Sequence, residues 1–191
     1  MVGVAVSAWN TTSVEATARY PADAHVPAGG RHFVRAVDVD ADAATTWRWV
    51  CQLAVAPYSY DLVDNLGRRS PRTLTPGAER IQLGQRVLFG PVVELEAGRL
   101  LVVAARGVGQ RVCGPVAMSY EVVPGRRTPS RILLCLAVGP PRRPLTWLDR
   151  AWQQLLGAGD LVMARRQLLN LRDLAQTSAQ AGVGPAGRLR P

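Results

Sequence analysis

The 191-residue sequence contains no lysine, so all 23 of its basic residues are arginine. Cysteine is also scarce, and Cys51, Cys113 and Cys135 form no Cys-x-x-Cys pair or other spacing typical of metal ligands. The segments Gly-x-Ser-x-Gly and His-Glu-x-x-His, which mark many hydrolases and zinc proteases, do not occur. We therefore predict no metal site and no cofactor, with free buried thiols in a reducing compartment.

Long hydrophobic runs are absent as well. No stretch approaches the roughly 18 apolar residues that a membrane-spanning helix needs, so we expect no membrane insertion. The first twenty residues lack the positive start of a signal peptide, and the polar segment 10–15 interrupts any apolar core of one. These absences favour a cytoplasmic location.

Acidic residues are few, and the formal net charge is +9. Most of the excess positive charge lies after residue 64, largely as separated arginine pairs such as Arg126-Arg127 and Arg165-Arg166. Basic surfaces can bind nucleic acid, but these pairs have no aromatic residues interleaved among them for base stacking. We read them as a solvated surface and expect no nucleic-acid partner.

The clearest positive signal is an amphipathic helix predicted over 160–176. Its apolar residues recur at steps of three and four, and no glycine or proline interrupts the run. Asp160 stands where an N-cap belongs, after a Gly157–Gly159 separator that would end a shorter helix over 145–156. An apolar stripe of this length needs a partner surface built from the rest of the chain.

Most of the chain before that helix shows the two-residue period of β-strands. A first strand is predicted over 32–40, followed by a helix that Asp40 or Asp42 caps and that runs to about Leu53. A second short helix is predicted over 58–67, ended by Gly67. The remaining predicted strands cover 86–89, 92–96, 99–105, 116–123 and 131–138.

This order, with strands grouped apart from helices, predicts an α+β fold. A curved antiparallel sheet would wrap around the long C-terminal helix, and the first strand would lie at or near a sheet edge. We expect three parts: an N-terminal extension over 1–30, partly irregular and with a short helix near Thr12–Arg19, a main domain over 31–178, and a disordered Gly/Pro-rich tail over 179–191.

Several segments resemble the START/Bet v 1-like superfamily of helix-grip proteins, which includes polyketide cyclases/dehydrases and lipid carriers. The resemblance spans about residues 15–178 in order and is closest to bacterial, largely actinobacterial, SRPBCC proteins of uncharacterised role. It rests on Val37–Ala41, Trp47–Leu53, Ala56–Asp61, Asp64–Pro71, Leu83–Gln85 and Gly159–Leu171. It implies a helix-grip fold with a deep apolar cavity between the sheet and the last helix.

Three functions remain open on this basis, because one fold hosts many chemistries. The first is binding of a small apolar or aromatic, lipid- or polyketide-like molecule in that cavity. The second is an enzyme of the cyclase or dehydratase type, which would use cavity tyrosine and aspartate side chains. The third is a homodimeric interaction protein, because 100–105 and 132–138 are apolar on both faces.

The candidate catalytic residues are Tyr58, Tyr60, Asp61 and Tyr120. The first three lie between two predicted helices, where they would form a polar rim at the cavity mouth or simply cap and pack a helix corner. Tyr120 shares its strand face with Met118 and Val122, so its phenol should point to the core and needs a polar partner.

The candidate ligand-binding set combines aromatic, apolar and amide side chains expected to line the cavity. Gln167 and Asn170 are its polar members on the last helix, where they would contact the cavity or mark the solvent boundary of the stripe. Asp64 and Asn65 would point inward or satisfy local backbone groups, and Arg35 would enter the cavity unless its strand is bulged or its head reaches the edge. The full set is Trp49, Tyr58, Tyr60, Met118, Tyr120, Leu134, Met163, Gln167 and Asn170.

Overall fold

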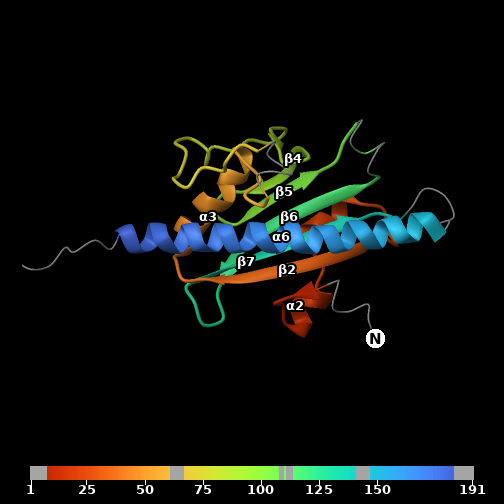
Figure 1. Ribbon diagram of the computed structural model, residues 1–191, viewed down its shortest axis with the longest axis horizontal. Helices are drawn as coiled ribbons and strands as arrows, with labels where there is room; N and C mark the ends of the chain where they lie inside the picture. The colour runs from red at the N-terminus through yellow and green to blue at the C-terminus, as the bar shows by residue number, and fades with distance from the viewer. Residues whose placement is uncertain (1–7, 61–66, 108–109, 111–113, 141–146, 183–191) are drawn as a thin grey trace, which may run out of the picture.

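A seven-stranded sheet with one long helix across it forms the body of the protein, which we describe from a computed structural model (Figure 1). The structure describes residues 8–60, 67–107, 110, 114–140 and 147–182, without the side chains of 147–161. The strand order is β1-β2-β7-β6-β5-β4-β3. All neighbouring strands are antiparallel except β1 (Ala8–Trp9), which pairs in parallel with β2 (Arg31–Val39). This architecture confirms the predicted helix-grip fold.

The predicted strands are confirmed with shifts of a few residues at their ends. The first of them, β2, lies second from the edge, as expected, while the edge strand β1 was not predicted. The others are β3 (Arg86–Val87), β4 (Gly90–Glu96), β5 (Leu100–Ala104), β6 (Val116–Pro124) and β7 (Ser130–Val138). The tight β4–β5 turn needs Gly98, whose φ of 85° is a conformation that only glycine adopts readily.

Two short helical elements follow β2. Helix α3 (Ala43–Cys51) begins where the Asp42 carboxylate accepts a hydrogen bond from the Thr45 N–H at 2.8 Å, as the predicted N-cap requires. It continues into the 3-10 helix η2 (Gln52–Ala54). The further helix predicted over 58–67 lies mostly outside the described residues, although residues 58–60 are not helical.

Helix α6 (Trp147–Gly182) is continuous, so the prediction of two helices separated at Gly157–Gly159 was wrong. Asp160 lies inside α6 and is not an N-cap. The physical reason is that an interior glycine costs only about 1 kcal/mol relative to alanine and keeps its backbone N–H. A glycine ends a helix only when the following chain leaves it, and here the chain continues as helix α6 through both positions.

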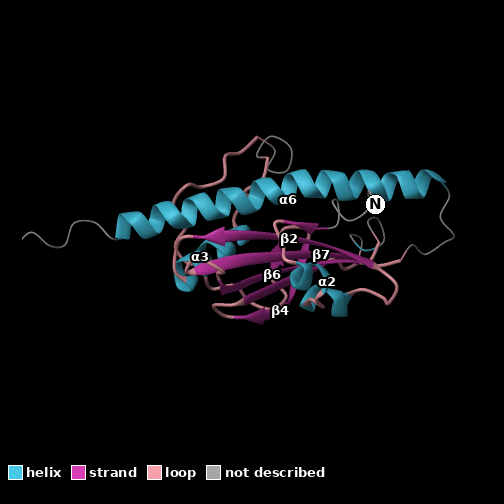
Figure 2. Cartoon of the chain, turned by 90° about the horizontal axis from the view of Figure 1, so that it is seen from below, coloured by secondary structure: helices cyan, strands magenta, loops and turns pink. Residues whose placement is uncertain are grey.

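The two faces of the sheet are covered by different parts of the chain. We call the face under α6 the helix face; it carries Val37, Leu101, Tyr120 and Leu134, all buried. Figure 2 shows α6 lying along this side of the sheet, and Figure 1 shows α2 (Ser13–Thr17) beyond the edge on which β2 lies.

The opposite face, which we call the outer face, is covered by the N-terminal segment. Tyr20 and Ala22, around the start of the 3-10 helix η1 (Pro21–His25), pack on Ala36 and Cys135. Strands β5 (Leu100–Ala104) and β7 (Ser130–Val138), whose two apolar faces suggested a dimer, therefore bury the second face within the chain itself.

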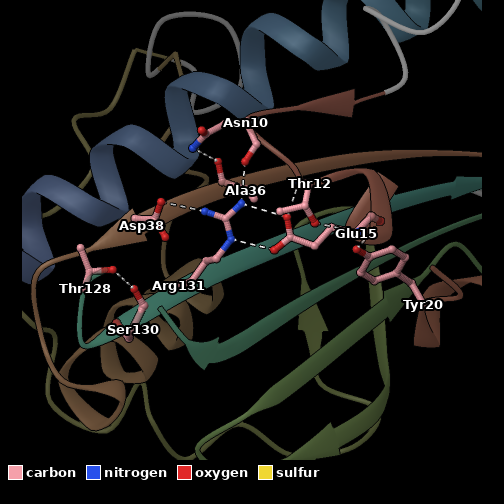
Figure 3. A network of polar contacts seen from close by, with 9 residues as sticks. All are labelled: Asn10, Thr12, Glu15, Tyr20, Ala36, Asp38, Thr128, Ser130 and Arg131. Atoms are coloured by element: carbon pink, nitrogen blue, oxygen red, sulfur yellow. Dashed lines mark hydrogen bonds and ion pairs between the residues drawn. The ribbon is translucent and has the colours of Figure 1, made fainter. Parts of the chain in front are cut away.

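A charged network fastens the N-terminal segment to the outer face (Figure 3). Arg131 of β7 is 1% exposed and donates to Glu15 Oε1 at 2.9 Å and to the Asn10 carbonyl oxygen at 2.6 Å. Its other terminal nitrogen, Nη1, lies 2.9 Å from Asp38 Oδ2. Glu15 in turn accepts from the Thr12 N–H, in a capping box that begins α2. One buried guanidinium thus holds β1, α2 and β2 together.

Candidate functional site

The interface between the helix face and α6 contains a buried polar link. The phenol of Tyr120 donates to Gln167 Oε1 at 2.5 Å and lies 3.0 Å from the Met118 sulfur. The Gln167 amide nitrogen donates to the Pro57 carbonyl oxygen at 2.6 Å. Gln167 is therefore an interior residue of the interface and does not mark the solvent boundary. Tyr120 has the polar partner that its burial requires.

The corner after η2 has a strained residue at its centre. Tyr58 is buried and adopts a φ of 56°, which a bulky side chain rarely does. Asn170 of α6 donates from Nδ2 to the Tyr58 carbonyl oxygen at 2.8 Å. Such a conformation costs about 1–3 kcal/mol and persists only where its surroundings hold it. Both predicted amides of α6, at positions 167 and 170, thus bind this corner.

Aromatic packing completes the corner. The rings of Trp49 and Tyr58 meet edge to face, with centroids 6.2 Å apart. The indole N–H of Trp49 donates to the Ser178 hydroxyl at 2.9 Å. Ser178 was not predicted, although it lies on the same flank of α6 as Asn170, eight residues further on, and that spacing would have found it. The thiol of nearby Cys51 stays neutral, because burial and then Glu79 raise its pKa to about 12.

The helix face changes character along the sheet. In the register row of Arg35, Leu134 and Tyr120, every side chain is fully buried. In the next row, Phe33 and Met118 are only partly buried beside Leu136. The row after that pairs Val138 with Val116, and both are again partly exposed. Apolar surface on the helix face therefore opens toward the end of the sheet where β2 begins.

Arg35 lies where this opening starts, and of the alternatives that the sequence left open, the bulged strand and the head that reaches the edge are both wrong. The β2–β7 register is unbroken across all nine strand residues, and Arg35 is 0% exposed. Its guanidinium donates to the Val34 carbonyl oxygen at 3.0 Å and lies 5.8 Å from the centre of the Phe33 ring. Strand alternation places it on the helix face with Val37 and Val39.

The structure brings most of the predicted ligand-binding set together. Trp49, Tyr58, Gln167 and Asn170 share the corner through the contacts above, and Tyr120 is bonded to Gln167. Leu134 is buried beside Tyr120, while Met118 and Met163 are partly buried. Tyr60 is 42% exposed and has no place in this interior group. Asp61, Asp64 and Asn65 lie outside the described residues.

Comparisons with protein-family models and with curated proteins find no match for this sequence. Among solved structures, the chain is similar to a protein of unknown function from Staphylococcus aureus, at 11% identity over 81% of this chain and 99% of that one, with a TM-score of 0.48. Norcoclaurine synthase from Thalictrum flavum matches at 13% identity over 88% and 96% of the two chains, with a TM-score of 0.42. CalU16 from Micromonospora echinospora matches at 14% identity over 82% and 91%, with a TM-score of 0.37.

At such low identities and TM-scores, these likenesses carry no argument about function. The helix-grip fold rests on the topology of the chain itself. Among the described residues, no helix has both the length and the apolar character needed to cross a membrane.

Proposed function

We propose that the protein binds a small apolar or aromatic molecule between the helix face and α6, with its entrance at the end of the sheet where β2 begins. The observation that carries this proposal is the change along the helix face. Every side chain is fully buried in the row of Tyr120, whereas Phe33 and Met118 in the next row, and Val138 and Val116 in the row after it, are partly exposed. Such a surface beneath a covering helix suits an apolar ligand.

The path of α6 supports an opening at this end. Gln176 Oε1 accepts from the Asp40 N–H, and Arg165 lies over the ring of Trp9, which pairs with Arg35. Eleven residues of α6 therefore accompany five of β2, and each length is about 16 Å. Continued at the same rate, α6 meets the row of Phe33 near residue 161 and the row of Arg31 near residue 156 or 157.

The sequence of α6 in that stretch favours free space. Gly157 and Gly159 have no side chain and Ala158 has only a methyl group, so the sequence of this stretch has little bulk. An interior glycine costs a helix about 1 kcal/mol relative to alanine, so the two glycines of this stretch call for a reason. Here the reason would be room for a ligand between this part of α6 and the sheet.

The inner end of the proposed site is polar. The Tyr120 phenol donates to Gln167 Oε1 and the Gln167 amide donates to the Pro57 carbonyl oxygen, so a ligand carbonyl or hydroxyl group would use their remaining capacity, which is the second Gln167 N–H and the lone pairs of the two oxygens. A ligand with an apolar body and one such group fits this arrangement.

The test uses a substitution that fills the opening. Met118→Trp should lower the affinity for an anilinonaphthalene sulfonate probe, and for a panel of fatty acids and aromatic polyketides, by about tenfold or more, because the indole would occupy the ligand's space. Leu83→Trp is the matched control, since Leu83 lies in a loop and is 66% exposed. Native mass spectrometry of the wild-type protein would identify a retained ligand. Equal binding by wild type and Met118→Trp would contradict the proposal.

The enzyme alternative has less support among the described residues. The Tyr120 phenol already donates its hydrogen bond to an amide oxygen, and that oxygen is too weak a base to remove the proton. Asp61, the predicted general base, lies outside the described residues. Binding without chemistry is therefore the function that we propose.

A further inference from the structure

The outer face contains a second group of chemically reactive side chains, on the opposite side of the sheet from the proposed ligand site. Asp23 of η1, His32 of β2 and Cys135 of β7 each offer one donor atom, and the three atoms lie within 4.8 Å of one another. They are far apart in the sequence and follow no metal-binding spacing, so the sequence predicted no metal here. The tertiary structure alone brings them together.

The contacts within this group already resemble part of a coordination sphere. His32 Nδ1 lies 3.2 Å and 3.3 Å from the two carboxylate oxygens of Asp23. In a tetrahedral zinc site, with bonds of about 2.0–2.3 Å, neighbouring ligand atoms are about 3.3–3.7 Å apart. The Asp23–His32 pair fits that separation, and a shift of about 1 Å or less would bring the Cys135 sulfur into range.

The surroundings hold these side chains in place. The second carboxylate oxygen of Asp23 accepts from the Tyr20 N–H at 2.8 Å, which fixes its rotamer. The ring of Tyr20 packs edge to face on His32, with centroids 6.1 Å apart. Outer-shell contacts of this kind orient metal ligands in known sites.

A buried polar atom beside Cys135 points the same way. Ser119 pairs directly with Cys135 across the β6–β7 ladder, so both side chains lie on the outer face. Among the residues that the structure describes, the Ser119 hydroxyl is buried without a hydrogen-bond partner. A water on the open coordination position of a bound metal would supply one.

An ordinary structural role explains only part of the group. The Asp23–His32 contact by itself would fasten η1 to β2, and it needs no thiol. The neighbours of Cys135 on this face include the small side chains of Ala36, Ala117 and Ala137. The group supplies one oxygen, one nitrogen and one sulfur donor. Zinc and similar divalent transition metals bind all three types of donor.

We propose that Asp23, His32 and Cys135 form a binding site for a divalent transition metal of the zinc type, with one coordination position left open. The metal would take the place of the proton between His32 and Asp23 and would displace the thiol proton of Cys135. Both His32 and Asp23 are partly exposed, which leaves the metal a path from solvent. Binding would tie the N-terminal segment to β2 and β7.

The test uses the full-length protein without a histidine tag, prepared free of metal. Added Co²⁺ should bind one ion per chain and give a thiolate-to-cobalt charge-transfer band, because Cys135 supplies a sulfur ligand. Cys135→Ser should abolish the band, and His32→Ala should weaken Zn²⁺ binding by about tenfold or more, since even outer-shell changes cost 10–100-fold. Zn²⁺ should also raise the thermal unfolding midpoint of the wild type but not of these variants.

Matched control variants test whether the cobalt band comes from this site or from the other two cysteines and the other histidine. Cys51→Ser removes a buried thiol from the opposite side of the sheet, and His25→Ala removes the histidine that contacts Glu94. Cys113→Ser covers the third cysteine. All three should keep the band. Should Cys135→Ser fail to fold, Cys135→Ala and Asp23→Asn carry the same test. A wild type without the band, or a band that survives in every variant at position 135, overturns the proposal.

Discussion

The two faces of the sheet are stabilised in different ways. The interface between the helix face and α6 buries large side chains, among them Trp49, Tyr120 and Leu168, and apart from the Arg35 guanidinium its polar contacts described above are made by neutral amides, hydroxyls and an indole. The outer face buries mainly small side chains and depends on the ionised contacts of Arg131 and Glu15. Burial of apolar area is insensitive to pH, whereas ionised contacts are not. Acid should therefore loosen the N-terminal segment before it affects the packing of α6.

The largest effect is expected from a truncation on the helix face. Leu168→Ala should lower the free energy of unfolding by about 2–5 kcal/mol, because Leu168 of α6 is fully buried in the core and its truncation leaves a cavity. Urea unfolding followed by circular dichroism would measure it. Val162→Ala on the same helix is the control, since Val162 is 53% exposed and its truncation should change little. Similar losses in both variants would show that the helix face is not the main core.

The next largest effect is expected on the outer face. Arg131→Met should cost about 2–3 kcal/mol, less than the 3–5 kcal/mol of a fully buried ion pair, because Glu15 and Asp38 are partly exposed. The same urea experiment measures the loss, and limited proteolysis should show cleavage near residues 8–26. Arg99→Met is the control, because Arg99 is exposed beside Glu96 and should contribute little. Unchanged proteolysis would argue against the role of Arg131 as the fastener.

A smaller effect is expected from the polar link under α6. Tyr120→Phe should cost about 1–2 kcal/mol, because it leaves the buried Gln167 carbonyl oxygen without its phenol donor. Tyr60→Phe, at an exposed position, should be nearly neutral and serves as the control. A neutral Tyr120→Phe would mean that water or another group replaces the phenol.

The smallest effect should depend on pH. Burial alone would raise the pKa of Glu15, but the hydrogen bonds from Arg131 and Thr12 outweigh it and leave the pKa below its ordinary value of 4.5. The folded state therefore binds fewer protons than the unfolded state, so this stabilisation is complete above pH 4.5 and is lost as the pH falls through the lowered pKa. Glu15→Gln should cost about 1 kcal/mol at neutral pH and almost nothing in acid.

Glu121 should behave in the opposite way to Glu15, because its pKa is shifted up instead of down. Burial raises the pKa of Glu121, and Arg99 offsets only part of that rise. The carboxylate is therefore unfavourable when it is ionised, and Glu121→Gln should stabilise the protein at neutral pH. Urea unfolding across the acid range would compare the two variants. Parallel pH profiles for Glu15→Gln and Glu121→Gln would contradict the assignment of either carboxylate.

Local patterns accounted for much of the site as well as of the fold. The two-residue period at 116–123 placed Tyr120 toward the core, and helical spacing placed Gln167 and Asn170 on one flank of α6. Their partners could not be predicted, because the Pro57 and Tyr58 carbonyl groups reach α6 only through the turn after η2. The strained backbone at Tyr58 likewise has no signature in the sequence.

The sequence by itself determined the strands, their antiparallel succession, the Asp42 cap and the apolar stripe of the last helix. These features depend on residues that are neighbours along the chain, so their spacing is sufficient to predict them. Only the tertiary structure decided that α6 continues through Gly157 and Gly159, that the N-terminal segment covers the outer face, and that Asp23, His32 and Cys135 meet there. The covering of the outer face and the meeting of Asp23, His32 and Cys135 depend on contacts between distant segments, and such contacts leave no period in the sequence. The glycines at 157 and 159 are compatible with a break or with a continuous helix, so the sequence alone does not decide between the two.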